Sequence, residues 1–370
     1  MPSARQQLRD RELQVGRRSK GSETAAAGTD AGAQTVTAGP IRTITDLARL
    51  AGVTAGTVSR ALSNNALVKE DTRERIQALA REHGFRLNEM ASRLRRQKTD
   101  VIGVAIPLGH DRRQHISDTF FMTLLGRLAD ELTERGYDIM LRRVIPDRDP
   151  DWLDRFIGSG MIDGLIVIGQ SDQFERIEQA AEGYRPMVVW GNRQEGQRHC
   201  VVGTDNRLGG KLAAERLIAA GATDLAFLGE TTAMEFGARF AGAREVAERM
   251  HVPIRALPTH LAQEGMAREI AGHLDRILPG CNGIFAATDT IAVACLHELR
   301  RRGVAVPDAV RIVGFDDLPV ARETVPGLTS IRQDIAAGAR AMVDLLLRRM
   351  AGAETESLVM PPQLIARETA

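Results

Sequence analysis

Arg60 and the small and hydroxyl-bearing residues around it have the types and spacing to contact a DNA duplex. An arginine can pair with a guanine edge or a phosphate, and Ala55 could touch the methyl group of a thymine. Ala55 and Gly56 bring no hydrogen-bonding side chain, so we expect specificity to depend on Arg60 and on DNA shape. The candidate contacts in this stretch are Thr43, Thr54, Ala55, Gly56, Thr57, Arg60 and Ser63.

Two short helices would have to present these residues. Thr43 and Thr54 each precede apolar residues at helical spacing, and a threonine at that position accepts free backbone N–H groups. Gly52 lies between the two runs and can adopt the left-handed conformation that ends a helix. The pattern predicts a helix-turn-helix whose second helix enters the major groove. An αα-hairpin packed in an ordinary core would show the same pattern.

The composition limits the possible classes of protein. A chain of 370 residues suggests two or three domains, and 49 Lys and Arg against 48 Asp and Glu leave no global basic excess. The cysteines, Cys200, Cys281 and Cys295, are too widely spaced for a disulfide framework or a metal cluster, so we expect no cofactor and no metal. Without a secretory signal or an apolar membrane span, we expect a cytoplasmic protein.

Signatures of enzymes are absent from the sequence. No nucleophile elbow, zinc-protease, phosphate-loop or dinucleotide-binding motif occurs in a suitable context. The adjacent acids Asp316 and Asp317 do not by themselves indicate a glycosidase. We therefore expect no catalytic residues and no enzymatic activity.

The first hundred residues divide into three segments. Residues 1–40 are polar, with many arginines, and predict a disordered tail or an arm that contacts phosphates. Residues 41–86 predict a compact three-helix headpiece, with a third helix from about Glu70 to His83. Residues 87–99 are basic, and predict either a solvated linker or a hinge helix that folds on DNA.

From Val101 onward the chain alternates between strands and helices. The run VIGVAIP is nearly all apolar, as a buried parallel strand should be. Two consecutive series of this kind predict an α/β core of two doubly wound parallel sheets. We place the first lobe at about 100–203 and 329–355, and the second at about 204–328 and 356–368. Ligands in such lobes bind at the carboxyl ends of the strands.

The combination of AGVTAGTVSRAL with GFDD and, further on, LTSIRQD resembles the LacI/GalR family of transcriptional regulators over about residues 41–368. The resemblance implies a periplasmic-binding-protein-like core at 100–370. It also implies a repressor that binds a near-palindromic operator as a homodimer, away from any membrane, and responds to a small-molecule effector such as a sugar. The sequence does not decide whether the effector is an inducer or a corepressor. The alternative is a sugar-binding protein of a transport system that shares the two-lobed fold.

The resemblance assigns further DNA contacts to the hinge. Asn88 would begin the hinge helix, and Ala91 and Leu94 share one face of it. Leu94 would insert as an apolar wedge into the minor groove, which unstacks a base step and bends the duplex.

The resemblance also assigns an effector site between the lobes. Arg239 would hold ligand oxygens with its planar fork of donors, and Asp316 would accept from hydroxyls or merely end a strand. Trp190 suits either a sugar ring or packing between the lobes. The remaining candidates are Phe120, which would stack on the ligand, Phe121, which we expect in the core, Thr288, and Asp289, which we expect to cap a helix.

Overall fold

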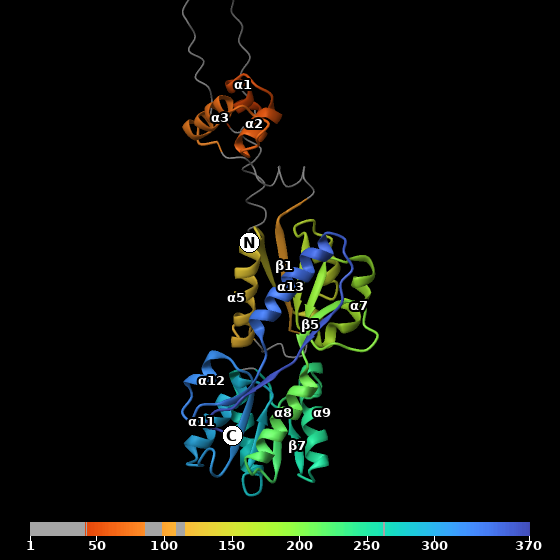
Figure 1. Ribbon diagram of the computed structural model, residues 1–370, viewed down its shortest axis with the longest axis vertical. Coiled ribbons are helices and arrows are strands. Elements are labelled where there is room, and N and C mark those ends of the chain that lie inside the picture. Colours follow the sequence, from red (N-terminus) through yellow and green to blue (C-terminus); the bar gives the residue numbers. More distant parts are fainter. Residues whose placement is uncertain (1–40, 42, 86–97, 109–114, 262) are drawn as a thin grey trace, which may run out of the picture. The chain divides into compact units, whose positions relative to one another are not determined.

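A computed structural model describes residues 41, 43–85, 98–108, 115–261 and 263–370 of the chain (Figure 1). It divides into two units, one that ends at Leu87 and one that begins at Asn88. The tail at 1–40 and the hinge candidates Asn88, Ala91 and Leu94 lie outside the described residues. No helix within the described ranges is long and apolar enough to cross a membrane.

The first unit contains α1 (Ile44–Ala51), α2 (Ala55–Leu62) and α3 (Glu70–Glu82). Thr43 caps α1, because its side chain accepts from the backbone of Asp46 while the Asp46 carboxylate accepts from the Thr43 backbone. Gly52 ends α1 with a φ of 65°, in the left-handed region. Both features confirm the predicted helix-turn-helix.

Side chains from all three helices close the core of this unit. Lys69 precedes α3 without a side-chain cap, and Glu70 and Asp71 in the first turn favourably face the positive end of the helix dipole. The buried core residues are Leu47, Ala48, Ala51, Val58, Ala61, Val68, Ile76 and Ala80. Phe85, which follows α3, packs against this cluster.

The second unit contains two six-stranded sheets (Figure 1). The first has the order β2-β1-β3-β4-β5-β11 and the second β7-β6-β8-β9-β10-β12. Neighbouring strands run parallel except β10 and β12, which are antiparallel. The strands are β1 (Val101–Pro107), β2 (Asp138–Val144), β3 (Gly164–Ile168), β4 (Met187–Trp190), β5 (Cys200–Thr204), β6 (Leu225–Leu228), β7 (Ile254–Leu257), β8 (Gly283–Ala286), β9 (Arg311–Asp316), β10 (Thr329–Arg332), β11 (Leu358–Met360) and β12 (Gln363–Ile365).

Helices cover both faces of the first sheet. Side chains alternate along β1, so Val104 packs beneath α5 and α13 while Ala105 packs beneath α6 and α7. In the second lobe α8 packs against α9, and α10 against α11. The helices are α5 (Thr119–Glu134), α6 (Trp152–Ile157), α7 (Phe174–Gly183), α8 (Asn206–Ala219), α9 (Met234–Arg249), α10 (Gln263–Ile277), α11 (Asp289–Arg301), α12 (Pro319–Glu323) and α13 (Ile335–Met350), with short 3-10 turns at Pro146–Arg148 and Ser171–Gln173.

The predicted lobe boundaries near the C-terminus need correction. β10 belongs to the second sheet, where it pairs with β9 and buries Ile331 in the second-lobe core. β11 belongs to the first sheet, where it pairs with β5. The chain therefore passes to the first lobe after β10 rather than before it, and returns with β12 rather than at residue 356. Three crossings join the lobes.

Candidate functional site

The N-terminal end of α2 presents a small polar surface in the first unit. The Thr54 hydroxyl accepts from the backbone N–H of Thr57 at 3.2 Å, and the two hydroxyls lie 2.9 Å apart. Gly56 and Arg60 are exposed, and a side chain added at Gly56 would lie 3.8 Å from the Arg60 guanidinium. The Arg60 side chain thus extends back along α2 toward its N-terminus.

Two of the other candidates in this unit already use their hydroxyls within the protein. The Thr43 hydroxyl donates to Asp46 at 2.7 Å, and the Ser63 hydroxyl donates to the Ser59 carbonyl at 2.9 Å. Ala55 is half-buried and packs against the headpiece core. Among these residues, Arg60 therefore combines exposure with a charge that could reach a base edge or a phosphate.

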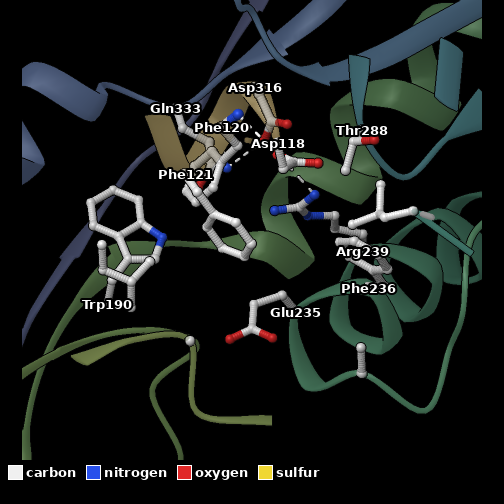
Figure 2. A pocket seen from close by; sticks show the side chains of 14 residues that line it. Asp118, Phe120, Phe121, Trp190, Glu235, Phe236, Arg239, Thr288, Asp316 and Gln333 are labelled. Carbon is white, nitrogen blue, oxygen red and sulfur yellow. Dashed lines mark hydrogen bonds and ion pairs between the residues drawn. The ribbon is translucent and has the colours of Figure 1, made fainter. Parts of the chain in front are cut away.

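In the second unit, the carboxyl ends of strands from both lobes meet at one cavity (Figure 2). The cavity includes six of the seven predicted effector residues. The lining is Asp118, Phe120, Phe121, Ile168, Gly169, Trp190, Ala233, Glu235, Phe236, Arg239, Leu261, Thr288, Asp316 and Gln333.

The first lobe contributes aromatic rings to this cavity. The ring centroids of Phe120 and Trp190 lie 5.9 Å apart, and those of Phe120 and Phe121 lie 6.0 Å apart at near edge-to-face geometry. Trp190 is only 5% exposed and packs in the first-lobe core while it also lines the cavity, so a packing role and contact with a sugar ring are compatible. Phe121 is half-buried, packs against the first-lobe core as expected, and also reaches the cavity.

The second lobe contributes a buried arginine that the protein itself already engages. Arg239 is 4% exposed; its Nε donates to Asn206 Oδ1 at 2.8 Å and its Nη1 to the Ala287 carbonyl at 2.5 Å. The guanidinium carbon lies 3.6 Å from the centroid of the Phe315 ring. Burial lowers the pKa of Arg239 from its usual value, although the neighbouring Asp316 opposes that change.

Asp316 faces Arg239 across the second-lobe side of the cavity. Its Oδ1 lies 4.0 Å from Arg239 Nη1 and accepts from Gln333 Nε2 at 2.6 Å. Burial raises the pKa of Asp316 to about 7, against the opposing effects of Arg239 and Gln333. Asp316, the last residue of β9, has a φ of 110° and the next residue, Asp317, a φ of 53°, so both have a backbone conformation that favours glycine. Asp316 therefore both ends a strand and lines the cavity.

Asp289 does not line the cavity, and the predicted helix cap is its neighbour. Thr288 caps α11, because its hydroxyl accepts from the backbone N–H of Ile291 at 3.2 Å. The fully buried Asp289 points inward, where it accepts from the Ser330 hydroxyl at 2.6 Å and from the Leu318 backbone at 2.7 Å. The role of Asp289 is structural, but it holds the turn after β9 rather than the end of a helix.

Sequence reasoning missed three side chains of the lining that carry chemistry: Glu235, Phe236 and Gln333. Gln333 directly follows β10, and the rule that ligands bind at the carboxyl ends of strands could have indicated it. Glu235 lies four residues before Arg239 on α9, so helical spacing places both on one face. Asp118 caps α5 by accepting from the Phe120 backbone at 2.9 Å.

A chain of hydrogen bonds crosses between the lobes beside the cavity. In the first lobe, Gln170 accepts from His199 and donates to the Asn192 carbonyl. The backbone N–H of Asn192 donates to Glu235 of the second lobe at 3.2 Å, and Asn206 Nδ2 donates to Asn192 Oδ1 at 3.2 Å. Because Asn206 also accepts from Arg239, the cavity and the lobe contact share one network.

The family models match both units of the chain. The model of bacterial regulatory proteins, lacI family, matches residues 43–88, and that of the periplasmic binding protein-like domain matches residues 214–370. The HTH-type transcriptional regulator CelR of Thermobifida fusca is 30% identical over 342 residues, which are 88% of this chain and 98% of the relative. The ribose operon repressor of Bacillus subtilis (strain 168) is 29% identical over 333 residues, with the same coverage of both chains.

Solved structures agree with these matches. The transcriptional regulator CelR–cellobiose complex has a TM-score of 0.63 at 27% identity, and the match covers 89% of this chain and 99% of that one. The lac repressor dimer bound to operator and the anti-inducer ONPF has a TM-score of 0.77, and 88% of this chain matches 98% of that one; at 21% identity, this likeness shows the fold. The chain belongs to the LacI family of DNA-binding transcriptional regulators.

Proposed function

We propose that this chain is a repressor that binds a near-palindromic operator as a homodimer and is controlled by a sugar bound between its core lobes. The observation that carries the proposal is the cavity, where aromatic rings from one lobe face a buried arginine–carboxylate pair from the other. Apolar faces beside convergent polar groups suit a sugar ring with its hydroxyls. The exposed start of α2 supplies the DNA-binding end.

The names of the relatives support a sugar as the effector class. They include repressors of ribose and sucrose operons, and one solved relative is a complex with cellobiose. We propose that a sugar binds the closed and the open arrangement of the lobes with different affinity, because only such a difference can shift an equilibrium between them. We also propose that the chain acts in the cytoplasm and does not convert its effector chemically.

We propose residues 87–99 as the hinge that couples lobe closure to DNA binding. Leu94→Ala should weaken binding to the operator much more than binding to non-specific DNA, because an apolar wedge contributes only where the duplex is bent around it. Fluorescence anisotropy with the two DNAs at matched salt measures the effect. Equal losses on both DNAs would contradict the wedge.

The proposed function is tested by a gel shift with the DNA upstream of the protein's own gene. We expect one retarded species at low nanomolar to micromolar protein, with a midpoint that moves when ribose, sucrose or cellobiose is added. A thermal-shift screen of the same sugars identifies the one that stabilises the folded core by mass action. Binding to no upstream fragment over a range of salt would contradict the regulator, and binding that no sugar changes would contradict the effector class.

A further inference from the structure

The protein itself already engages two nitrogens of the Arg239 guanidinium. A carboxylate or a phosphate is best held by two parallel N–H groups of one arginine, either Nε with Nη2 or Nη1 with Nη2. Nε has a single N–H, which donates to Asn206, so the face formed by Nε and Nη2 cannot hold an anion with both donors. Nη1 spends one of its two N–H groups on the Ala287 carbonyl. The stacking of the guanidinium on Phe315 holds it in this orientation.

The charge of Arg239 is also already balanced. Asp316 lies 4.0 Å from its Nη1, at a site where both groups are almost completely buried. Glu235 adds a second carboxylate to the second-lobe side of the lining (Figure 2). Within the described part of the lining, Arg239 is the basic residue that faces these acids. An anion that entered would add negative charge to a buried site without a cation left to pair with it.

Uncharged hydroxyls fit the same groups. The carboxylate of Asp316 and the side-chain oxygens of Glu235 and Gln333 can accept hydrogen bonds from hydroxyl groups. The faces of Phe120 and Trp190 can pack against the C–H face of a ring. Building on the proposed function, we propose that the effector is an uncharged sugar and that the cavity rejects sugar acids and sugar phosphates.

Matched pairs of sugars test this proposal. Calorimetry on the full-length protein at pH 7.5 would compare ribose with ribose 5-phosphate, glucose with glucuronate, and cellobiose with cellobionate. For the pair that contains the effector, we expect the neutral sugar to bind at least about 100-fold more tightly than its anion, because an unpaired buried charge is costly. An anion that binds as tightly as its neutral partner overturns the charge inference and leaves the regulator standing. If neither neutral nor anionic sugars bind, both the inference and the sugar effector fail.

A pair of variants tests whether the carboxylates cause the rejection. Glu235→Gln keeps an acceptor for the Asn192 N–H but removes one negative charge from the cavity. We expect it to lower the preference for the neutral sugar about tenfold through tighter binding of the anion. Glu248→Gln is the matched control, since Glu248 lies on α9 as well but is 69% exposed and outside the lining. A preference that Glu235→Gln leaves unchanged overturns the electrostatic explanation.

Discussion

The two lobes build opposite sides of one cavity from different kinds of interaction. The first lobe supplies Phe120 and Trp190, whose positions follow from packing on α5 and α13. The second supplies Arg239 and Asp316, whose positions follow from hydrogen bonds and charge compensation in a buried site. Apolar packing is non-directional, whereas a buried charge depends on each of its partners.

This difference assigns separate tasks to the lobes. The ion pair and its hydrogen bonds are formed between groups of the protein itself, so the second lobe offers a polar surface whose side chains hold one another in place. The first lobe offers an apolar surface of aromatic rings on the other side of the cavity. Removing a member of the buried ion pair in the second lobe should therefore cost the most stability, whereas disturbing the packing of the first lobe should cost less and change the shape of the site.

The largest expected effect is that of Arg239→Ala on stability. The change leaves the buried Asp316 without its cation and two acceptors without a donor, so we expect the free energy of unfolding of the core to fall by about 3–5 kcal/mol. Urea denaturation monitored by circular dichroism measures it. Arg249→Ala is the control on the same helix. The Arg249 side chain is 61% exposed, so its ion pair with Glu215 should contribute less than about 1 kcal/mol. Similar losses in both variants would contradict the comparison of the lobes.

The next effect is a pH dependence that Asp316→Asn should remove. The pKa of Asp316 is about 7 in the folded chain, above its ordinary value of 3.8. Between these values the unfolded chain releases the proton and the folded chain keeps it. The contribution of Asp316 to stability therefore falls as pH rises from about 4 to about 7, by at most about 1.4 kcal/mol per pH unit, and is constant above that range.

The Asn variant lacks this slope, so its stability relative to the unmodified protein should rise over the same pH interval. Parallel urea denaturation of the two proteins at closely spaced pH values measures the difference, and other titrating groups cancel in it. A constant difference from pH 4 to pH 7 would show that burial does not perturb Asp316.

The local parts of the fold could be predicted because their causes are local. Thr43 and Gly52 specify the ends of α1 through backbone groups only a few residues away. The apolar run of β1 follows from burial on both faces. The lobe boundary could not be predicted in the same way. β10 belongs to the second sheet because it pairs with β9, and β11 belongs to the first sheet because it pairs with β5. No local sequence pattern identifies these partner strands.

The candidate site was likewise predictable only where its causes are local. The ends of strands together with the family resemblance indicated the region of Trp190 and Asp316, but not which neighbouring side chains turn toward the cavity. Asp289 follows β8 just as Asp316 ends β9, yet Asp289 points inward because Ser330 and the Leu318 backbone supply donors there. Glu235 escaped prediction because its use depends on Asn192 of the other lobe.

A smaller effect tests the packing of the first lobe. A methyl group at Gly338 on α13 would lie 2.3 Å from the ring of Trp190, so Gly338→Ala must displace that ring. We expect a loss of about 1–3 kcal/mol in stability and weaker binding of the sugar that gives the largest thermal shift, although Gly338 does not line the cavity.

The matched control for this variant is Gly126→Ala in α5 of the same lobe. An added methyl group there meets no atom within 4 Å, and alanine should stabilise the helix by about 0.5–1 kcal/mol. Thermal denaturation and calorimetry measure both proteins. If Gly338→Ala binds the sugar as the unmodified protein does, the position of the Trp190 ring does not determine the site.

The smallest effect separates folding from binding within the second lobe. Thr288 caps α11 and also lines the cavity, so Thr288→Ala should lower stability by about 1 kcal/mol through loss of the cap. Thr288→Ser retains the hydroxyl and should restore most of that loss. Because Arg239 and Asp316 are the charged contacts that we propose for the sugar, we expect calorimetry to show less than about a tenfold change in sugar affinity for the alanine variant. A larger loss, restored by serine, would instead assign Thr288 a direct contact with the ligand and extend the polar surface of the second lobe beyond its ion pair.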